Sequence, residues 1–310
     1  MILVIQDVHW KIKEPYFSGL KKLFDWFLKN YPDHAYIFTG DFFDISSPNW
    51  QTFVMARDYL LRMPYVHIVR GNHDYSSIKG NSLSALNLHR NISVYSAMSE
   101  VKINGNNFLM LPYDYKSEVM KAYENVTGYY DYVVTHVTPA RVAFGDEGID
   151  LRVKAKAIFH GHEHLSKDFQ ENEVTNHIIG VPQVTRNGEQ EFKKRMFEIK
   201  SDGSYQEIQL PIFMDIQDIK YGERIENKNF LYNVYDAPSQ QAVWEMYPKK
   251  EGYHIRDAGI EVFRSASEIQ EMKENLNWKN LEEVWSNENW LGTKESKEVI
   301  QCGLDYFSRV

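Results

Sequence analysis

Residues 1–9 read MILVIQDVH, an apolar run that ends at Gln6 and is followed by Asp7 and His9. A short continuous apolar run of this kind predicts a buried strand, because a strand covered on both faces has no polar side. Four further runs are also β-branched or aromatic and end in a polar cluster: 36–38, 66–69, 132–134 and 157–159. The sequence therefore places polar side chains at the ends of five buried strands.

Helical spacing separates the first two of these strands. Leu20, Leu23, Phe24 and Phe27 recur every three or four residues, which is the spacing of one buried helix face. A second helical segment is expected over 52–61. Farther along, Asn104-Gly105 and Asp202-Gly203 are hairpin-turn dipeptides within 101–111 and 176–210. Strands alternating with helices, followed by hairpins, predict a mixed α/β domain over residues 1–212.

Two shorter regions are expected after this domain. Residues 213–264 contain a strand candidate at 230–235, a helix candidate at 239–246 and a strand candidate at 254–263, which predict a small α/β domain. Residues 265–310 are predicted to be helical and contain nine acidic and five basic side chains. Trp278, Leu281 and Trp285 form one helical stripe there, which either packs onto its own domain or docks onto a partner.

The composition limits the class of protein. The chain has 310 residues, of which 43% are hydrophobic, so disordered, collagen-like and coiled-coil classes are excluded. No run of about 18 apolar residues occurs, and the single cysteine, Cys302, cannot form an internal disulfide. We therefore expect a cytoplasmic protein with no membrane partner. The net charge of −8 argues against a general nucleic-acid binder, although residues 265–310 carry half of that excess.

The polar clusters carry the candidate chemistry. The carboxyl ends of strands in α/β sheets are where ligands bind, so the five clusters are expected to face one site. Gly40, Gly71 and Gly161 would allow sharp turns and a close approach of the backbone to it. The side chains in question are Asp7, His9, Asp41, Asp44, Asn72, His73, Asp74, His136, His162 and His164.

This donor set points to metal chemistry. Imidazole and carboxylate groups without thiolate suit Mn, Fe or Zn rather than a structural zinc site. About seven ligands are too many for one ion with open positions, so two ions sharing a carboxylate are expected. Such pairs clamp the attacking and leaving oxygens of a phosphoryl transfer.

The ordered motifs D-x-H, G-D-x-x-D, G-N-H-D, H and G-H-x-H resemble the calcineurin-like metallophosphoesterases. Their form is most similar to the nuclease subunit of the SbcCD DNA-repair complex, in a short version of the kind that a phage can encode. Asp74 stands where protein serine/threonine phosphatases have Glu, and Ile45 follows Asp44 where they have Arg-Gly. Residues 179–183, IGVPQ, are similar to the Pro-Gly-Ser-Pro-Gln segment of the nuclease family. The resemblance implies a two-sheet sandwich flanked by helices, with a small α/β cap.

The resemblance also assigns the metal ligands. It implies two divalent ions, most often Mn, with Fe, Zn or Mg as alternatives, and Asp41 as the bridge between them. The remaining ligands would be Asp7, His9 and His164 for the first ion and Asn72, His136 and His162 for the second.

Three further residues receive roles from the resemblance. A metal-bound hydroxide would attack phosphorus, while His73 stabilises charge and protonates the leaving oxygen. Asp74 and Asp44 would fix the orientation of imidazoles. From the sequence alone, Asp74 can instead cap a helix after Ser76, Asp44 can be a turn residue, and His160 can simply pack in its strand.

The partners implied are DNA, an SMC-like ATPase of the SbcC type bound through residues 265–310, and a second copy of the chain. Tyr113 and Tyr115 either stack on a base or pack within the protein. Basic residues near the expected site either contact the phosphate backbone or form solvated faces. They are Arg141, Arg152, Lys154, Lys156, Arg186, Lys193, Lys194 and Arg195.

The sequence thus predicts Mn-dependent hydrolysis of DNA phosphodiesters, by an exonuclease or endonuclease subunit of an SbcCD-like repair and recombination complex. One alternative is a phosphatase or cyclic-nucleotide phosphodiesterase that acts on small phosphoesters, because Arg70 before Gly71 is also seen in phosphatases. A third reading is a non-catalytic scaffold for the ATPase.

Overall fold

The computed structural model describes residues 1–76, 80–143, 148–185, 189–225, 230–247 and 254–257. The chain divides into two compact units, Met1–Ala258 and Gly259–Val310. The second unit begins inside the range predicted for the small α/β domain. It lies outside the described residues, and so do the predicted tail at 265–310 and its tryptophans.

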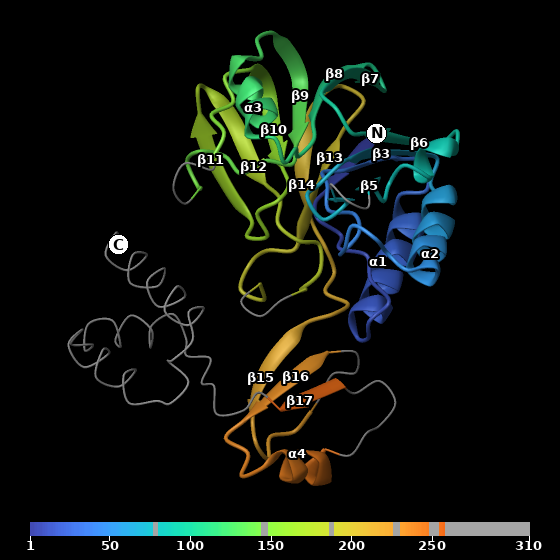
Figure 1. Ribbon diagram of the computed structural model, residues 1–310, viewed down its shortest axis with the longest axis vertical. Coiled ribbons are helices and arrows are strands. Elements are labelled where there is room, and N and C mark those ends of the chain that lie inside the picture. Colours follow the sequence, from blue (N-terminus) through green and yellow to red (C-terminus); the bar gives the residue numbers. More distant parts are fainter. Residues whose placement is uncertain (77–79, 144–147, 186–188, 226–229, 248–253, 258–310) are drawn as a thin grey trace, which may run out of the picture. The chain divides into compact units, whose positions relative to one another are not determined.

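The N-terminal strand lies inside the first sheet, with further strands on both of its sides (Figure 1). It has six strands in the order β14-β13-β1-β2-β3-β6. β1 pairs in parallel with β2 and antiparallel with β13. Helices α1 (Tyr16–Asn30) and α2 (Trp50–Leu61) connect the first strands. The strands are β1 (Ile2–Ile5), β2 (Ala35–Phe38), β3 (Tyr65–Val69), β6 (Ile92–Tyr95), β13 (Arg195–Ile199) and β14 (Tyr205–Gln209).

The second sheet also has six strands, in the order β11-β12-β10-β9-β8-β7. β8, β9, β10 and β12 are parallel, and hairpins add β7 and β11 at the two edges. The strands are β7 (Ser99–Ile103), β8 (Asn106–Leu111), β9 (Tyr129–Thr135), β10 (Lys154–His160), β11 (Lys167–Glu171) and β12 (Val174–Ile178). α3 (Ser117–Ala122) and η2 (Tyr123–Asn125) connect β8 to β9, whereas β4 (Tyr75–Ser76), β5 (Gly80–Asn81) and η1 (Leu86–Leu88) lie between β3 and β6 of the first sheet.

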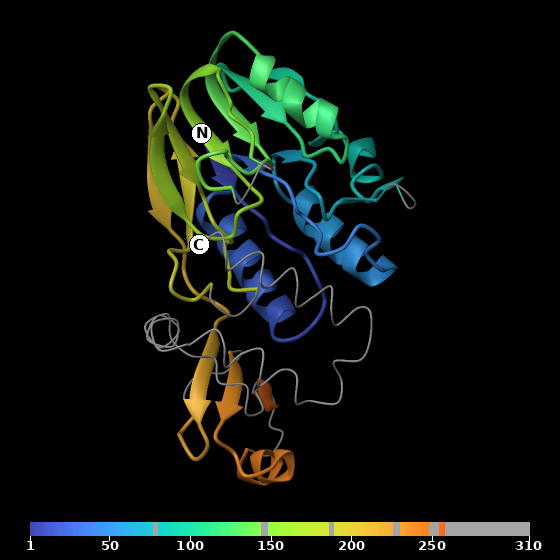
Figure 2. The same cartoon turned by 60° about the vertical axis from the view of Figure 1, so that its left-hand side comes forward.

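Alternation along β1 shows how the layers are built, since successive side chains of a strand point to opposite faces. Leu3 and Ile5 pack with Phe24 and other apolar residues of the helical layer. Ile2 and Val4 pack instead with Phe108 and its neighbours from the second sheet. The two sheets therefore face each other across a shared core, with α1 and α2 outside the first sheet (Figure 2).

A third sheet follows the sandwich. It has the order β15-β16-β17, with all strands parallel, and α4 accompanies it. Its own core includes Tyr232, Val234 and Val243. Gln183 Oε1 accepts hydrogen bonds from the backbone of Phe213 (2.8 Å) and Met214 (3.0 Å), where the chain leaves the sandwich. The elements are β15 (Ile216–Lys220), β16 (Leu231–Tyr235), α4 (Gln240–Met246) and β17 (His254–Asp257).

The predicted fold class is confirmed: the described residues form a mixed α/β structure with two large sheets. Both predicted hairpin turns are present, and Gly105 and Gly203 have φ values of 89° and 74°, a backbone conformation that favours glycine. Within the described part of the chain, every helix is too short or too polar to cross a bilayer.

Candidate metal centre

The five polar clusters come together at the carboxyl ends of the strands. Each chain segment turns sharply as it leaves its strand, and Asp7, His9, Asp41 and His162 have φ values of 37°, 48°, 44° and 76°. This left-handed conformation is costly for non-glycine residues and is concentrated at functional sites. The surrounding packing therefore holds these side chains toward one point.

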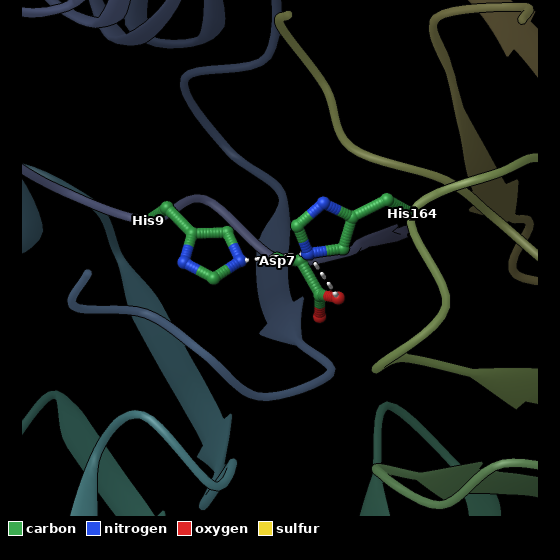
Figure 3. Close-up of side chains that lie close together, drawn as sticks. All are labelled: Asp7, His9 and His164. Atoms are coloured by element: carbon green, nitrogen blue, oxygen red, sulfur yellow. Dashed lines mark hydrogen bonds and ion pairs between the residues drawn. The ribbon is translucent and has the colours of Figure 1, made fainter. Parts of the chain in front are cut away.

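The first ligand group joins β1 to the segment after β10. Figure 3 shows Asp7, His9 and His164 converging. The Nε2 atoms of His9 and His164 lie 3.0 Å apart, and His164 Nε2 is 4.0 Å from Asp7 Oδ2. Their donor atoms all lie within 4.8 Å of one another, which is close enough to share one ion.

The second ligand group centres on Asn72. Its Oδ1 lies 3.0 Å from His136 Nε2 and 2.9 Å from His162 Nδ1. Asp41 reaches both groups, with Oδ1 3.3 Å from His136 Nε2 and Oδ2 3.9 Å from His9 Nε2. The structure thus brings together all seven of the side chains expected as ligands, with Asp41 between the two groups.

The chemistry of these atoms fits a cation. His136 Nδ1 lies 2.8 Å from the carbonyl oxygen of Thr39, so Nδ1 carries the hydrogen. The lone pair of its Nε2 then faces the oxygens of Asn72 and Asp41, an arrangement that a bound metal ion or a proton relieves. Asp7 Oδ1 is buried without a hydrogen-bond partner among the described residues, which is costly unless a cation binds it. The donors are all nitrogen and oxygen, as divalent metal ions of this class require.

The electrostatics agree with a site built for positive charge. Burial disfavours a charged His136, but the carboxylates of Asp41 and Asp7 outweigh burial and raise the pKa of His136 to about 9. Burial and the neighbouring His136 lower the pKa of His162 to about 4, so His162 is neutral and able to bind metal. Burial opposes the charge of Asp41 as well, yet His136 holds the pKa of Asp41 well below its usual range.

Two glycines permit the close approach of these groups. A Cβ at Gly40 would lie 2.1 Å from His136 Nδ1, and one at Gly71 would lie 2.1 Å from Asp41 Oδ1. Any side chain at either position would collide with a predicted ligand. The glycines of the motifs are therefore required by the geometry of the site.

His73 lies at the edge of the first ligand group. Its backbone N–H donates to Asp41 Oδ1 (2.8 Å), and its Nδ1 lies 2.7 Å from the carbonyl oxygen of Asp44. Its ring meets that of His9 edge-on, with centroids 4.9 Å apart. His73 also falls within metal-binding distance of His9 and Asp41. Since Nδ1 donates to a carbonyl, Nε2 is the nitrogen left for a substrate or an ion.

Asp44 lies where an imidazole-orienting group was expected. Its Oδ1 is 3.5 Å from His9 Nδ1 and 3.1 Å from Lys11 Nζ. Burial raises its pKa, but His9 and Lys11 outweigh burial and lower the pKa of Asp44 to about 2. The carboxylate is therefore charged and faces a predicted ligand.

The expectation for Asp74 is corrected. Its side chain is fully buried, so it cannot touch a substrate, and its oxygens accept from the backbone N–H groups of Gly71 (2.9 Å), Phe43 (2.9 Å) and Phe42 (3.3 Å). Asp74 thus holds two ligand-bearing turns together through their backbones and orients no imidazole. The alternative of a helix cap after Ser76 is also wrong, since Tyr75–Ser76 form β4. His160 packs in its strand, with Nε2 2.8 Å from Asn176 Oδ1.

Two residues that support the ligands, Gln6 and Glu189, were not predicted from the sequence. Gln6 is fully buried and links Asp7 Oδ2 (3.1 Å), the carbonyl of Glu163 and the backbone N–H of Gly180 (2.7 Å). Glu189 Oε1 lies 2.5 Å from His164 Nδ1. Gln6 could have been found from the sequence, because it directly precedes the predicted ligand Asp7. Glu189 lies 25 positions beyond His164 in the sequence and has no such signal.

The predicted DNA-contacting residues divide into two sets. Lys194 and Arg195 are buried, so the expectation that they contact DNA is corrected: Lys194 donates to the carbonyl of Glu189, and Arg195 pairs with Asp168 and Glu207. DNA contact stays a prediction for five exposed residues, four of which already have a protein partner: Arg141 donates to Gln170, Arg152 to Asp150, Lys156 pairs with Asp131, and Lys193 pairs with Glu207. The fifth is Lys154, and Arg186 lies outside the described residues.

An α/β sandwich whose strand ends bring Asp, Asn and His side chains within metal-binding distance of one another is the arrangement of a metal-dependent hydrolase. Residues 1–166 match the family described as calcineurin-like phosphoesterase. The chain therefore belongs to this family, which hydrolyses phosphoesters with divalent metal ions.

Two solved structures are similar to this chain. An archaeal phosphodiesterase matches with 16% sequence identity and a TM-score of 0.38, over 67% of this chain and 99% of the other. The phosphopantetheinyl hydrolase of Mycobacterium tuberculosis matches with 15% identity and a TM-score of 0.40, over 58% of this chain and 88% of the other. A search of curated protein sequences returned no match.

Proposed function

We propose that this protein hydrolyses DNA phosphodiester bonds with Mn²⁺, as the nuclease subunit of an SbcCD-like complex. Membership of the phosphoesterase family and the two ligand groups around Asp41 support hydrolysis of a phosphoester. The choice of DNA rests on the resemblance of Gly71–Asp74 and of 179–183 to the nuclease family. A small-molecule esterase also leaves residues 213–310 without a role.

The hydrogen-bond partners of Arg70 are the observation that favours a phosphodiester over a phosphomonoester as the substrate. Arg70 is buried, and its Nη2 donates to the carbonyl of Tyr113 (2.6 Å) and to Asp114 Oδ2 (3.0 Å). Lys11 is likewise paired with Asp44. A phosphomonoester dianion is best held by an arginine fork, but Arg70 and Lys11 are both already bound to protein groups. A singly charged diester needs less compensation.

The chain's own residues would place a proton at the leaving oxygen. Bound divalent ions would polarise the phosphoryl group and activate water. His73 donates through Nδ1 to the carbonyl of Asp44, so Nε2 can carry the proton for the leaving group. A new bond forms from the water oxygen to phosphorus, and the bond from phosphorus to the leaving oxygen breaks. The leaving oxygen takes a proton from His73, and water supplies the proton that restores it.

The test compares three substrates with the purified full chain and Mn²⁺. We expect cleavage of linear DNA and of bis(p-nitrophenyl) phosphate, weak turnover of p-nitrophenyl phosphate, and loss of all three activities in Asp41→Asn. Robust turnover of the monoester without cleavage of DNA would establish the small-substrate alternative. Metal binding without turnover of any substrate would favour the scaffold.

The partners form a separate part of this proposal. We propose that residues 265–310 bind an SMC-like ATPase in the cytoplasm, and that the nuclease acts as a dimer. Deletion of residues 265–310 should abolish co-purification with the ATPase and leave Mn²⁺ binding intact. Unchanged co-purification would refute the docking role, and sedimentation of the full chain as a monomer would refute the dimer.

A further inference from the structure

Three tyrosines stand beside the second ligand group, and we call them the tyrosine wall: Tyr75, Tyr113 and Tyr115. Tyr113 stacks on the imidazole of His162, with centroids 5.7 Å apart and planes 24° apart. Tyr115 packs edge-on against Tyr113 (5.2 Å) and tilted against Tyr75 (5.6 Å). The wall therefore begins at a predicted metal ligand and continues outward from it.

The wall is held in place by the polar groups around it. Arg70 bonds the carbonyl of Tyr113, and its guanidinium lies 4.9 Å from the ring centroid of Tyr75. The hydroxyl of Tyr115 donates to the carbonyl of Asn72 (2.8 Å) and lies 3.1 Å from that of Tyr75. A surface fixed before binding loses little conformational entropy when a ligand arrives.

Tyr115 is 54% exposed although its hydroxyl is anchored. A tyrosine that serves only to pack would bury its ring, because burial of the apolar ring is the source of its stabilising effect. Here the hydroxyl is bonded to the backbone of a ligand residue, and the ring remains open to solvent. Asp114, between the two tyrosines, is paired with Arg70, so its charge is compensated and repels a phosphate less.

We infer that the tyrosine wall stacks on a nucleobase of the nucleotide attached to the scissile phosphate. This inference rests on the proposed function and adds that the enzyme contacts a base as well as the sugar-phosphate backbone. Aromatic rings bind bases of any sequence, because every base has a π-face. The wall should therefore favour substrates that carry bases without selecting one base.

The test uses two single-stranded hexamers with the same phosphodiester backbone. One is hexathymidylate, and the other carries tetrahydrofuran in place of every nucleoside, so it lacks all bases. The readout is the ratio of kcat/KM for the two hexamers with Mn²⁺. This ratio does not depend on the fraction of active protein, so incomplete folding of a variant does not change it.

Wild-type protein should prefer hexathymidylate by about 5- to 150-fold, the range expected for one stacked base. Tyr115→Leu should reduce this preference at least fivefold. Tyr115→Phe keeps the ring and loses only the hydroxyl, so it should keep most of the preference. Tyr129→Leu is the control, because Tyr129 is also exposed (66%) but opens β9, whose other end carries the site.

Two results would overturn the inference: equal cleavage of both hexamers by the wild-type protein, or an unchanged preference in Tyr115→Leu. Cleavage of neither hexamer by the Mn²⁺-loaded wild-type protein would instead refute the proposed function, and the inference with it. The two failures are therefore distinct.

Discussion

Glu189 offers the sharpest test of how the site is supported, through the variant Glu189→Gln. Its Oε1 lies 2.5 Å from His164 Nδ1, and its Oε2 accepts from the backbone N–H of Thr185 (2.6 Å). Glu189 is 4% exposed, so water cannot replace a lost bond. A glutamine has one oxygen for these two donors, so its NH₂ group must face one of them.

The magnitude follows from that loss. Hydrogen bonds to charged groups contribute about 1.5–3 kcal/mol, against about 0.5–1.5 kcal/mol for neutral ones. Replacing the charged bond from Glu189 to His164 by the neutral bond of a glutamine therefore costs about 1 kcal/mol or slightly more, which is roughly a tenfold change in an equilibrium constant. Partners of metal-ligating histidines typically change metal affinity by about 10- to 100-fold. We expect Glu189→Gln to weaken binding of one Mn²⁺ ion by about tenfold.

Isothermal titration calorimetry with Mn²⁺ measures this change directly. Glu198→Gln is the matched control, because Glu198 is also buried and forms a similar pair with His34 (2.9 Å), at a distance from the ligands. Glu198→Gln should bind both ions as the wild-type protein does. Wild-type affinity in Glu189→Gln, or equal weakening in both variants, would refute the idea that Glu189 supports the metal through His164.

Further outcomes test other residues. His73→Asn should keep both Mn²⁺ ions and lower kcat for bis(p-nitrophenyl) phosphate by about 10²- to 10⁴-fold, and undiminished turnover would remove His73 from proton transfer. Burial lowers the pKa of His67 from 6.5 to about 4. Because the unfolded chain then binds a proton at His67 at a higher pH than the folded chain does, the free energy of unfolding falls as the pH drops from about 6.5 to about 4. Urea titrations at pH 7, 6 and 5 measure the free energy of unfolding of the wild type and of His67→Phe. The variant's free energy minus that of the wild type should rise by up to about 1.4 kcal/mol for each pH unit of acidification. A difference that stays constant with pH would contradict the assignment. Arg195→Ala should destabilise the fold by about 2–3 kcal/mol, because it removes a buried cation from two carboxylates, whereas the exposed Arg152→Ala should change it by less than about 1 kcal/mol.

The features that could be predicted from the sequence are those that depend on short stretches of neighbouring residues. Five inner strands, β1, β2, β3, β9 and β10, contain short apolar runs because these segments are covered on both faces, as the burial of all four residues of β1 illustrates. The convergence of Asp7 and Asp41 followed from topology, since β1 and β2 are neighbouring parallel strands whose carboxyl ends meet at one edge. A short sequence pattern determines both features.

The parts that were missed depend on contacts between distant segments. Lys194 and Arg195 read as a basic run, but β13 lies inside its sheet and Arg195 reaches across to Asp168 of β11. Asp74 belongs to a metal motif, yet its carboxylate is used on the backbone N–H groups of Phe42 and Phe43. Sequence spacing does not encode which side chain meets a remote backbone group, so these roles required the structure.

The central claim is that two ions share Asp41. An anomalous difference map from a crystal grown with Mn²⁺ tests it most directly. We expect two peaks roughly 3.5–4 Å apart. One should contact Asp7, His9 and His164, the other Asn72, His136 and His162, with Asp41 touching both. A single peak, or an ion bound by His73 in place of His164, would contradict it.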